Sequence, residues 1–268
     1  MTDGPLKANL PWATLRAATP ARIGLSRTGS ATATQCNLAF QLAHAEARDA
    51  VHAAFKPSKL VQPLRARNIS SVLLHSSACD RRAYLLRPDL GRKLDDASAA
   101  RLAPFAGGYD VAFVIVDGLS ARAIHSHAIP FLDDALSIFH RNNDWKVGPT
   151  CLVEQGRVAI GDEIGQILGA KLIVVMIGER PGLTSPDSLG IYLTYAPRVG
   201  RSDAERNCLS NIRPNGLPYQ EAAKRLGYLC NEARSRELTG FALKDESHDG
   251  FSALTQASRL TSSGGLGD

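Results

Sequence analysis

The sequence lacks long apolar runs, and we expect no secretory leader. Its longest uninterrupted apolar runs, 111–116 and 172–177, are six residues each, whereas a membrane-spanning helix needs roughly 20. The first residues show neither the charged start, nor the apolar stretch, nor the small-residue cleavage site of a secretory signal. We therefore expect no transmembrane helix, no membrane partner and a cytoplasmic location.

Paired cysteines and aromatic residues are scarce as well. Cys36, Cys79, Cys151, Cys208 and Cys230 form no C-x-x-C pair, so the pattern favours free thiols over a zinc site or a disulfide framework. Aromatic residues make up 6% of the chain, which leaves few platforms on which bases could stack. The net charge is only +5, and the Lys and Arg residues are mixed with Asp and Glu along the chain rather than grouped in a basic patch. We therefore expect no nucleic-acid partner.

The first part of the chain has a helical pattern. Residues 1–30 are polar, basic and without a clear period, which is typical of an arm. Residues 37–55 repeat apolar side chains at three- and four-residue steps and predict a helix that ends at Pro57. Its expected apolar face consists of Phe40, Ala43, Ala47, Val51 and Ala54. We predict a small N-terminal arm and helical unit over residues 1–65.

The middle of the chain alternates short apolar runs with helical stretches. The runs 71–75, 111–116, 151–153 and 172–177 are apolar on consecutive positions, as in strands buried on both faces. Helices are predicted at 121–139, kinked or split at Pro130, and at 162–168, ending at Gly169. This order predicts an α/β domain over residues 66–245, with a Rossmann-like, doubly wound, mainly parallel sheet.

A long stretch rich in Pro, Gly, Ser and Arg follows, over residues 181–217, and contains one strand-like run, 191–195. Ser202 and Glu205 have the spacing of a capping box and predict a short helix that carries Asn207 and Cys208. A clear amphipathic helix begins near Pro218 and ends before Gly240, with Cys230 on its apolar face. Residues 246–268 are rich in Ser and Gly and are predicted to form a flexible tail.

Ligands of open parallel sheets bind beyond the carboxyl ends of the strands, so the residues that follow each run are informative. These are His75, Asp117 and Gly118, residues 154–158 and residues 178–182. No G-x-G-x-x-G or G-x-x-x-x-G-K-[ST] motif is present, so the pattern does not favour dinucleotide or Walker-type phosphate binding.

Other chemistry-bearing residues have simpler interpretations. Asp162 and Glu163 lie in the first turn of a predicted helix, where the helix dipole favours acids, so capping is preferred over catalysis. His125 and His127 point to different helix faces and do not suggest a shared metal. For Cys208, its basic sequence neighbours leave a functional thiol and a buried thiol equally open.

Longer motifs resemble one family. Residues 152–165, 177–190 and 203–214 closely resemble the small (light) subunit of ethanolamine ammonia-lyase, and so do residues 19–25, 41–52 and 87–92. The resemblance extends from about residue 14 to residue 245. It implies a hetero-oligomer with a large (heavy), barrel-forming subunit and adenosylcobalamin bound between the two. It also leaves open a location within a bacterial microcompartment, although the start of this chain is shorter than the extension linked with packaging.

The family's reaction is that of an adenosylcobalamin-dependent carbon–nitrogen lyase. Ethanolamine becomes acetaldehyde and ammonia after homolysis of the cobalt–carbon bond, hydrogen abstraction, migration of the amino group and elimination. The cofactor carries the radical chemistry and the protein supplies position and electrostatics. Since the resemblance places substrate contacts in the large subunit, we expect no catalytic residue and no protein metal ligand in this chain.

The resemblance also implies cofactor-binding residues. Val158 in Gly-Arg-Val, Glu179 in Gly-Glu-Arg-Pro-Gly and Cys208 in Arg-Asn-Cys occupy the family's cobalamin-contact positions. Arg157 and Arg180, their neighbours, are suited to amide carbonyls or to the phosphate of the nucleotide loop. No histidine has an Asp two positions before it, so the D-x-H-x-x-G motif is missing and the cofactor is expected base-on, with its own dimethylbenzimidazole.

Two alternatives remain open from the sequence. One is a subunit that chiefly stabilises assembly and has little direct cofactor role. The other is an independent Rossmann-like protein that binds another nucleotide by itself.

Overall fold

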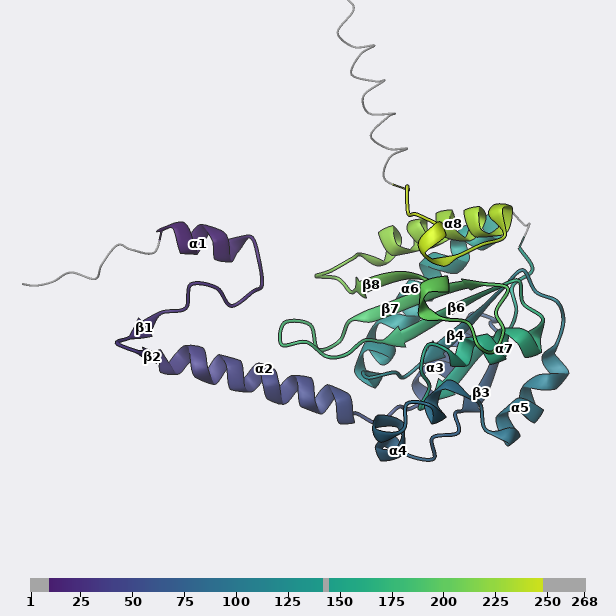
Figure 1. The fold of residues 1–268 in the computed structure, drawn as a ribbon, viewed down its shortest axis with the longest axis horizontal. Coiled ribbons are helices and arrows are strands. Elements are labelled where there is room, and N and C mark those ends of the chain that lie inside the picture. Colours follow the sequence, from purple (N-terminus) through teal and green to yellow (C-terminus); the bar gives the residue numbers. More distant parts are fainter. Residues whose placement is uncertain (1–9, 142–144, 248–268) are drawn as a thin grey trace, which may run out of the picture.

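A central sheet of six strands organises the computed structural model, which describes residues 10–141 and 145–247 (Figure 1). The strands are β3 (Ser71–His75), β4 (Val111–Val116), β5 (Thr150–Glu154), β6 (Leu172–Gly178), β7 (Leu189–Tyr195) and β8 (Asn207–Ile212). Their order across the sheet is β3-β5-β4-β6-β7-β8. The first four are parallel, and β7 and β8 are antiparallel to their neighbours. The sheet is therefore mixed and mostly parallel.

Helices cover both faces of this sheet, which gives two apolar cores. On one face lie α3 (Ser58–Ala66), α6 (Ala121–Arg141) and α8 (Tyr219–Arg236), and on the other lie α5 (Asp96–Leu102) and α7 (Ile160–Leu168). In β4, Val111, Phe113 and Ile115 belong to the first core, while Ala112, Val114 and Val116 belong to the second. Consecutive apolar positions are thus explained by burial on both faces.

The α/β architecture with a mainly parallel sheet is confirmed. If the four parallel strands are numbered 1 to 4 by their order in the sequence, their order across the sheet is 1-3-2-4. Dinucleotide-binding sheets have the order 3-2-1-4-5-6, which is different. The Rossmann-like, doubly wound description is therefore not confirmed, and the division at residues 65 and 245 stays a prediction. The predicted tail lies outside the described residues from 248 onward.

Strand β3 lies at an edge of the sheet and differs from the prediction of burial on both faces. Leu73, at its centre, is 43% exposed. The outer edge of β3 is closed by side chains from α5, because Arg101 donates to the Leu73 carbonyl (2.6 Å) and the Ser98 hydroxyl accepts from the His75 amide (2.8 Å). Hydrogen bonds from side chains of α5, rather than an apolar layer, therefore cover these outward backbone groups of β3.

Two helix predictions are corrected. The helix α6 runs without a break through Pro130, so a split there is wrong, while the alternative of a kink stays a prediction. Phe131 and Leu132 lie on the buried face of this helix. The capping box of Ser202 and Glu205 is present, but it opens only a 3-10 turn, Asp203–Glu205. Asn207 and Cys208 belong to β8, because pairing with β7 takes over from the local helical signal.

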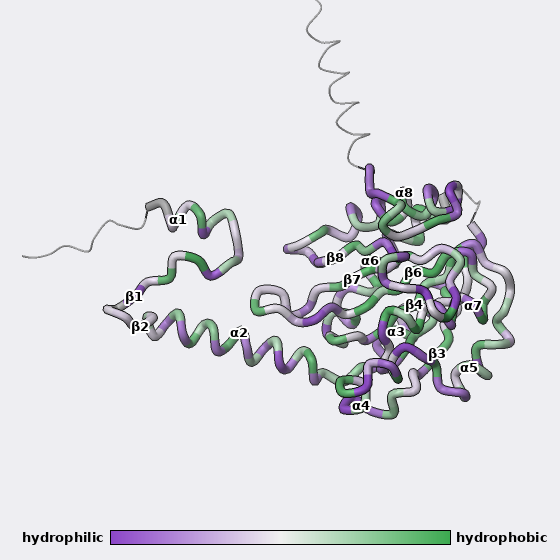
Figure 2. Tube along the Cα trace, in the orientation of Figure 1, coloured by the Kyte–Doolittle hydropathy of each residue, from purple (hydrophilic) through white to green (hydrophobic). Residues whose placement is uncertain are grey.

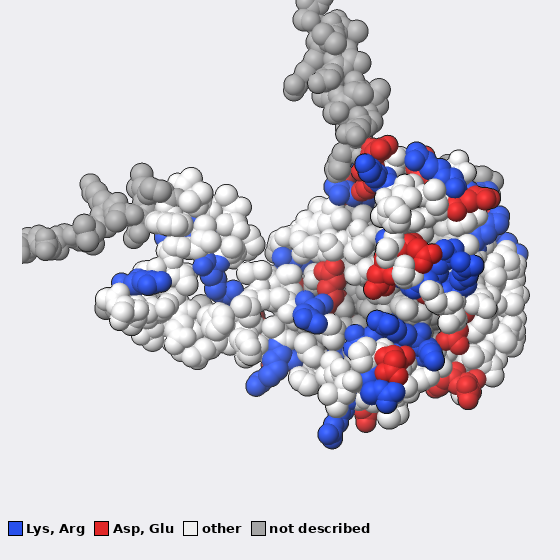
Figure 3. Space-filling model, viewed as in Figure 1, with Lys and Arg blue, Asp and Glu red and all other residues white. Residues whose placement is uncertain are grey.

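The N-terminal arm, residues 10–52, extends away from the sheet (Figure 1). It contains α1 (Leu10–Ala17), a small hairpin of β1 (Arg27–Thr28) and β2 (Ala31–Thr32), and α2 (Thr34–His52). The predicted helix is confirmed, but α2 buries only Ala43 and Ala50, and Phe40 of the expected apolar face is 44% exposed. Figure 2 shows apolar segments, in green, along α2, and the face of the arm visible in Figure 3 is mostly white, with a few Lys or Arg side chains in blue.

Within the described ranges, no helix is both long and apolar enough to cross a bilayer. The predicted cytoplasmic location remains a prediction.

Candidate functional site

A cavity of about 420 Å³ lies beyond the carboxyl ends of β5 and β6. Four of the five residues that the sequence singled out line it, namely Arg157, Val158, Glu179 and Arg180. The other lining residues are Tyr84, Leu119, Ile177, Gly178 and Tyr192. The fifth predicted residue, Cys208, does not line the cavity. The loops after β5 and β6 therefore line the same cavity, although β4 lies between these two strands in the sheet.

The loop after β5 is shaped by close backbone packing. Gln155 has a positive φ of 55°, and a Cβ on Gly156 would lie 2.6 Å from the Val116 side chain. The amide of Arg157 then donates to the carbonyl of Gly91 at 2.7 Å. Since only glycine fits beside Val116, the chain turns sharply here and presents Arg157 and Val158 to the cavity.

Arg157 is held over an aromatic ring, and its buried Nε donor has no partner in the described part of the chain. Its guanidinium lies 4.5 Å from the centre of the Tyr84 ring, and its Nη2 donates to the Tyr84 carbonyl (2.9 Å). The Nε of Arg157 is buried and has no hydrogen-bond partner among the described residues. A buried donor without an acceptor is costly, so this atom is suited to a ligand oxygen.

Glu179 follows β6 and reaches across β7 toward β8. Its backbone amide donates to the Ser188 carbonyl (3.0 Å), and its carboxylate accepts from the amide of Asn211 at 3.2 and 3.3 Å. Gly190 makes this path possible, because a Cβ there would lie 2.9 Å from the carboxylate. The carboxylate retains lone pairs for a further donor.

Cys208 lies one strand away from the cavity, on β8, and pairs in register with Tyr192. The residue as a whole is exposed, but its sulfur lies near Glu179 and Tyr192. Burial of the sulfur and the charge of Glu179 raise the pKa of the Cys208 thiol, although the Tyr192 hydroxyl acts against them. The thiol is therefore neutral at physiological pH, which does not suit a nucleophile.

The basic neighbours of Cys208 in sequence are not its neighbours in space. Arg206 is buried and forms a two-pronged ion pair with Asp162, with both distances 2.7 Å, and Arg201 pairs with Glu205. Asp162 lies in the first turn of α7, as predicted, and its ion pair joins that turn to the residue before β8, which is a structural role beyond helix capping. The arginine cluster stabilises the fold next to the cavity rather than lining it.

Sequence reasoning missed the aromatic walls of the cavity. Tyr84 lies on α4 (Arg81–Leu86), is almost fully buried and stacks with Arg81 as well as Arg157. Burial raises the pKa of the Tyr84 hydroxyl to about 12. The spacing of Arg81 and Tyr84, three positions apart on a helix, was the available signal for this stack. Tyr192 on β7 carried no local signal.

The two histidines serve separate contacts. His125 accepts from the Lys56 amide at 3.0 Å, and the Nδ1 of His127 lies 2.7 Å from the Tyr219 hydroxyl. Burial lowers the pKa of both imidazoles. Over residues 10–141 and 145–247, no group of three His, Cys, Asp or Glu side chains is arranged to hold a metal ion.

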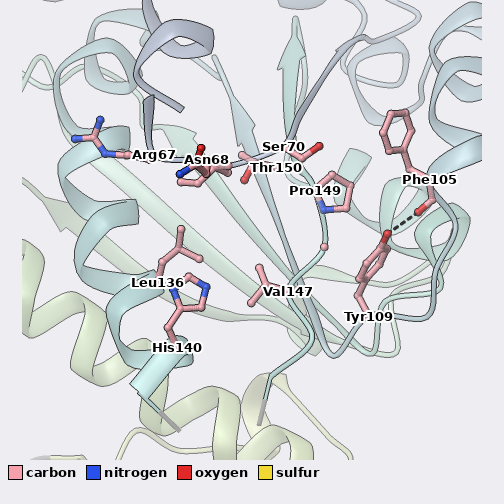
Figure 4. A pocket seen from close by; sticks show the side chains of 12 residues that line it. Arg67, Asn68, Ser70, Phe105, Tyr109, Leu136, His140, Val147, Pro149 and Thr150 are labelled. Carbon is pink, nitrogen blue, oxygen red and sulfur yellow. Dashed lines mark hydrogen bonds between the residues drawn. The ribbon is translucent and has the colours of Figure 1, made fainter. Parts of the chain in front are cut away.

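A second cavity of about 370 Å³ lies at the opposite end of the sheet, before the first residues of β3, β4 and β5 (Figure 4). Two of its polar side chains are already engaged. Arg67 donates to both oxygens of Asp133 (2.5 and 2.8 Å), and the Tyr109 hydroxyl donates to the Phe105 carbonyl (3.0 Å). The one arginine among the described residues that line this cavity is therefore already paired with a carboxylate.

The fold and the first cavity place the chain in the class of α/β proteins with a ligand-sized cavity at the carboxyl ends of parallel strands. Sequence comparison is more specific. Residues 9–244 match the model of the ethanolamine ammonia-lyase light chain (EutC), and the chain belongs to this family.

Several relatives, each called ethanolamine ammonia-lyase small subunit, cover most of the chain. The protein from Xanthomonas campestris pv. campestris (strain ATCC 33913) is 57% identical over 241 residues, which is 88% of both chains. That from Pseudomonas fluorescens (strain SBW25) is 54% identical over 253 residues, covering 92% of this chain and 91% of the relative. That from Azotobacter vinelandii (strain DJ) is 54% identical over 250 residues, or 92% of both. The family resemblance seen in the sequence is thus confirmed.

Proposed function

We propose that this chain is the small subunit of an ethanolamine ammonia-lyase and that it forms one wall of an adenosylcobalamin site, with a large subunit forming the rest. The observation that carries the proposal is the convergence of Arg157, Val158, Glu179 and Arg180 on one cavity. The family membership and the names of the relatives support it.

The size of the cavity supports a shared site. Drug-sized molecules occupy cavities of roughly 300–1,000 Å³, and adenosylcobalamin is considerably larger than such molecules. A cavity of about 420 Å³ therefore accommodates only part of the cofactor. The remainder of the cofactor would contact the partner, as expected for a ligand at an interface between subunits.

The residues around the cavity fit the chemistry of cobalamin. The unpartnered Nε of Arg157 and the guanidinium of Arg180 would donate to amide carbonyls or to the phosphate of the nucleotide loop. Glu179 would accept hydrogen bonds from corrin amide groups, and Val158 offers apolar surface to the macrocycle. Cys208 would contribute weak contact from β8. None of the described residues that line the cavity is a histidine, which fits the proposed base-on form.

Adenosylcobalamin supplies radical chemistry through cleavage of its cobalt–carbon bond, and the complex would use it to convert ethanolamine to acetaldehyde and ammonia. This chain would bind and orient the cofactor and keep water from one side of it. We assign no catalytic residue to it.

The test is a cobalamin titration of the complex with the large subunit. Glu179→Ala combined with Cys208→Ala should weaken the binding of cobalamin, followed by its absorbance, by about tenfold or more, mostly through Glu179. His140→Ala, in the cavity at the opposite end of the sheet, is the matched control and should leave affinity unchanged. Unchanged affinity in the double variant would overturn the cofactor role and favour the assembly role.

An assembly role has an observation of its own, in the N-terminal arm. Six exposed large apolar side chains lie between residues 12 and 42, namely Trp12, Leu15, Leu25, Leu38, Phe40 and Leu42. Apolar surface of this kind marks an interaction site. Residues 34–45 of α2 contain no Asp, Glu, Lys or Arg, so the exposed apolar side chains of this stretch are not separated by charged residues.

We infer that the arm contributes to association with the large subunit. Changing Leu38, Phe40 and Leu42 to Gln should weaken that association, measured by analytical ultracentrifugation of the mixed subunits, without lowering the thermal stability of the isolated chain. An unaltered association would refute the inference. If the isolated chain instead bound NAD tightly, the third interpretation, an independent nucleotide-binding protein, would be supported.

A further inference from the structure

We propose that Asp117 is a positioning residue that fixes both loops of the candidate cofactor cavity relative to each other, an inference that rests on the proposed function. Asp117 directly follows β4, the strand that separates β5 from β6 in the sheet. Its side chain is 2% exposed and does not line the cavity. It would therefore act through its neighbours rather than by touching the cofactor.

The first loop, after β5, is held by a hydrogen bond to the Asp117 carboxylate, which also binds the turn after β4. Its Oδ1 accepts from the amide of Gly118 (2.9 Å) and from the amide of Gly156 (3.2 Å). Gly156 immediately precedes Arg157 and Val158, two residues of the cavity wall. The bond to Gly156 thus ties the turn after β5 to the end of β4.

The second loop is held through the turn that begins at Asp117. Gly118 has a φ of 58°, and the amide of Leu119 donates to the carbonyl of Gly178 (2.9 Å). The two turns are in close backbone contact, because a Cβ on Gly178 would lie 2.7 Å from the carbonyl oxygen of Asp117. Gly178 immediately precedes Glu179, so the contact with the turn after β4 also fixes the backbone position from which the Glu179 side chain extends.

Arg81 completes the cluster from α4. Its Nη1 lies 3.6 Å from Oδ2 of Asp117 and donates to the Gly118 carbonyl (2.8 Å), while Nε and Nη2 donate to the Val51 carbonyl (3.0 and 2.7 Å). Its guanidinium also lies 4.7 Å from the centre of the Tyr84 ring, which contacts Arg157 in turn. A buried carboxylate is expensive unless it is paired and hydrogen-bonded, and here each of its bonds leads to an element of the cavity wall.

The experiment uses the complex with the large subunit and compares Asp117→Ala with Asp110→Ala. Asp110 precedes the same strand, accepts from the Lys146 amide (3.0 Å) and pairs with Lys171 (2.9 Å), but it lies at the opposite end of the sheet. Asp117→Ala should weaken cobalamin binding by about tenfold and speed hydrogen exchange of the Gly118 and Gly156 amides. The KM for ethanolamine at saturating cobalamin should stay within about twofold of wild type. Asp110→Ala should leave cobalamin binding unchanged.

Asp117→Asn provides a conservative variant, because its amide oxygen can still accept from Gly118 and Gly156. It should restore cobalamin affinity to within about threefold of wild type. If Asp117→Ala does not assemble, Asp117→Asn is compared with Arg81→Met, which should weaken binding more than Asn does. If Asp117→Asn lost as much cobalamin affinity as Arg81→Met, the result would contradict the proposal that the side-chain oxygen at position 117 positions the loops by accepting from the Gly118 and Gly156 amides.

The outcomes separate this inference from the proposed function. If Glu179→Ala weakens cobalamin binding and Asp117→Ala behaves like Asp110→Ala, the positioning role is overturned and the cofactor site stands. If neither Glu179→Ala nor Asp117→Ala changes the affinity, the proposed cofactor site itself fails. Equal loss of affinity in Asp110→Ala and Asp117→Ala would show a general effect on the fold and would also overturn the inference.

Discussion

The two ends of the sheet carry cavities of similar volume, about 420 Å³ at the carboxyl end and about 370 Å³ at the amino end, but their polar groups are in different states. At the amino end, Arg67 is saturated by Asp133. At the carboxyl end, Arg157 keeps a buried donor without a partner, and Asp117 lies buried behind the wall. The two cavities are therefore similar in volume, and they differ in whether the arginine in their wall is paired or keeps a buried donor without an acceptor.

The largest expected difference between the two ends of the sheet is in the stability lost when a glycine is replaced by alanine. Gly178→Ala places a Cβ 2.1 Å from the Ser120 carbonyl oxygen, which is backbone and has little room to move. We expect a loss of about 3 kcal/mol or more in the free energy of unfolding, measured by urea titration. Gly148→Ala, at the amino end, meets side-chain atoms of Tyr109 and Ala112 at 3.0 and 3.1 Å, and about 1 kcal/mol should be lost. Equal losses would contradict the comparison.

The next difference is in pH dependence. Burial raises the pKa of Asp117 to about 6, against the opposing effect of Arg81. Because the folded state holds this proton more tightly than the unfolded state, the contribution of Asp117 to stability falls as the pH rises from about 4 to about 6. Between pH 4 and pH 6, the free energy of unfolding of wild type should fall by on the order of 2 kcal/mol relative to that of Asp117→Asn, as measured by urea unfolding at each pH. A constant gap between the two proteins would refute this.

Asp110, at the other end of the same strand, should show the opposite sign. Burial acts to raise its pKa, but hydrogen bonds from the Lys146 amide and Lys171 outweigh it, and the pKa is lowered. Its stabilising contribution is present above the unfolded pKa and is lost as the pH falls through the folded pKa. The stability advantage of wild type over Asp110→Asn should therefore shrink in acid, in the same unfolding series. An advantage that grows in acid would be inconsistent with the structure.

A smaller effect is expected from the arginines that face each cavity. Arg157→Met retains much of the apolar stem but removes the unpartnered donor, and it should weaken cobalamin binding by the complex about tenfold, or about 1.4 kcal/mol. Arg67→Met, whose charge is paired with Asp133, should change the affinity by less than about twofold. The two variants are compared in the same absorbance titration. A larger effect from Arg67→Met would reverse the assignment of the two ends.

The smallest effect should come from Cys208, beside the carboxyl-end cavity but not in its wall. Cys208→Ser should change cobalamin affinity by about twofold or less, since the thiol offers only weak contact. Because its pKa is raised, Cys208 should also react with iodoacetamide more slowly than free cysteine at pH 7.5, as followed by peptide mass spectrometry. Faster reaction would contradict the raised pKa.

The sequence predicted those parts of the site that depend on local pattern and on a general rule of parallel sheets. The apolar runs identified β4 and β6, and the rule that ligands bind beyond carboxyl ends directed attention to Arg157 and Glu179. These residues meet because β5 and β6 flank β4 and point the same way.

What the sequence did not predict depends on contacts between distant segments. The capping box of Ser202 correctly indicated a turn, but the strand that carries Cys208 forms only because β7 is available for pairing. Tyr84 reaches the cavity through the packing of α4, about 70 positions before Arg157. The pattern of α2 predicted its helix but could not show that the domain leaves that helix largely uncovered.

The closed outer edge of β3 limits how copies of this protein can aggregate. An open edge strand presents free amides and carbonyls that recruit another strand and propagate a fibre. Here Arg101 and Ser98 already occupy the outward carbonyl of Leu73 and the outward amide of His75. An incoming strand would have to displace a charged hydrogen bond before gaining its own, so intermolecular β-sheet growth from this side is opposed even though Leu73 is exposed.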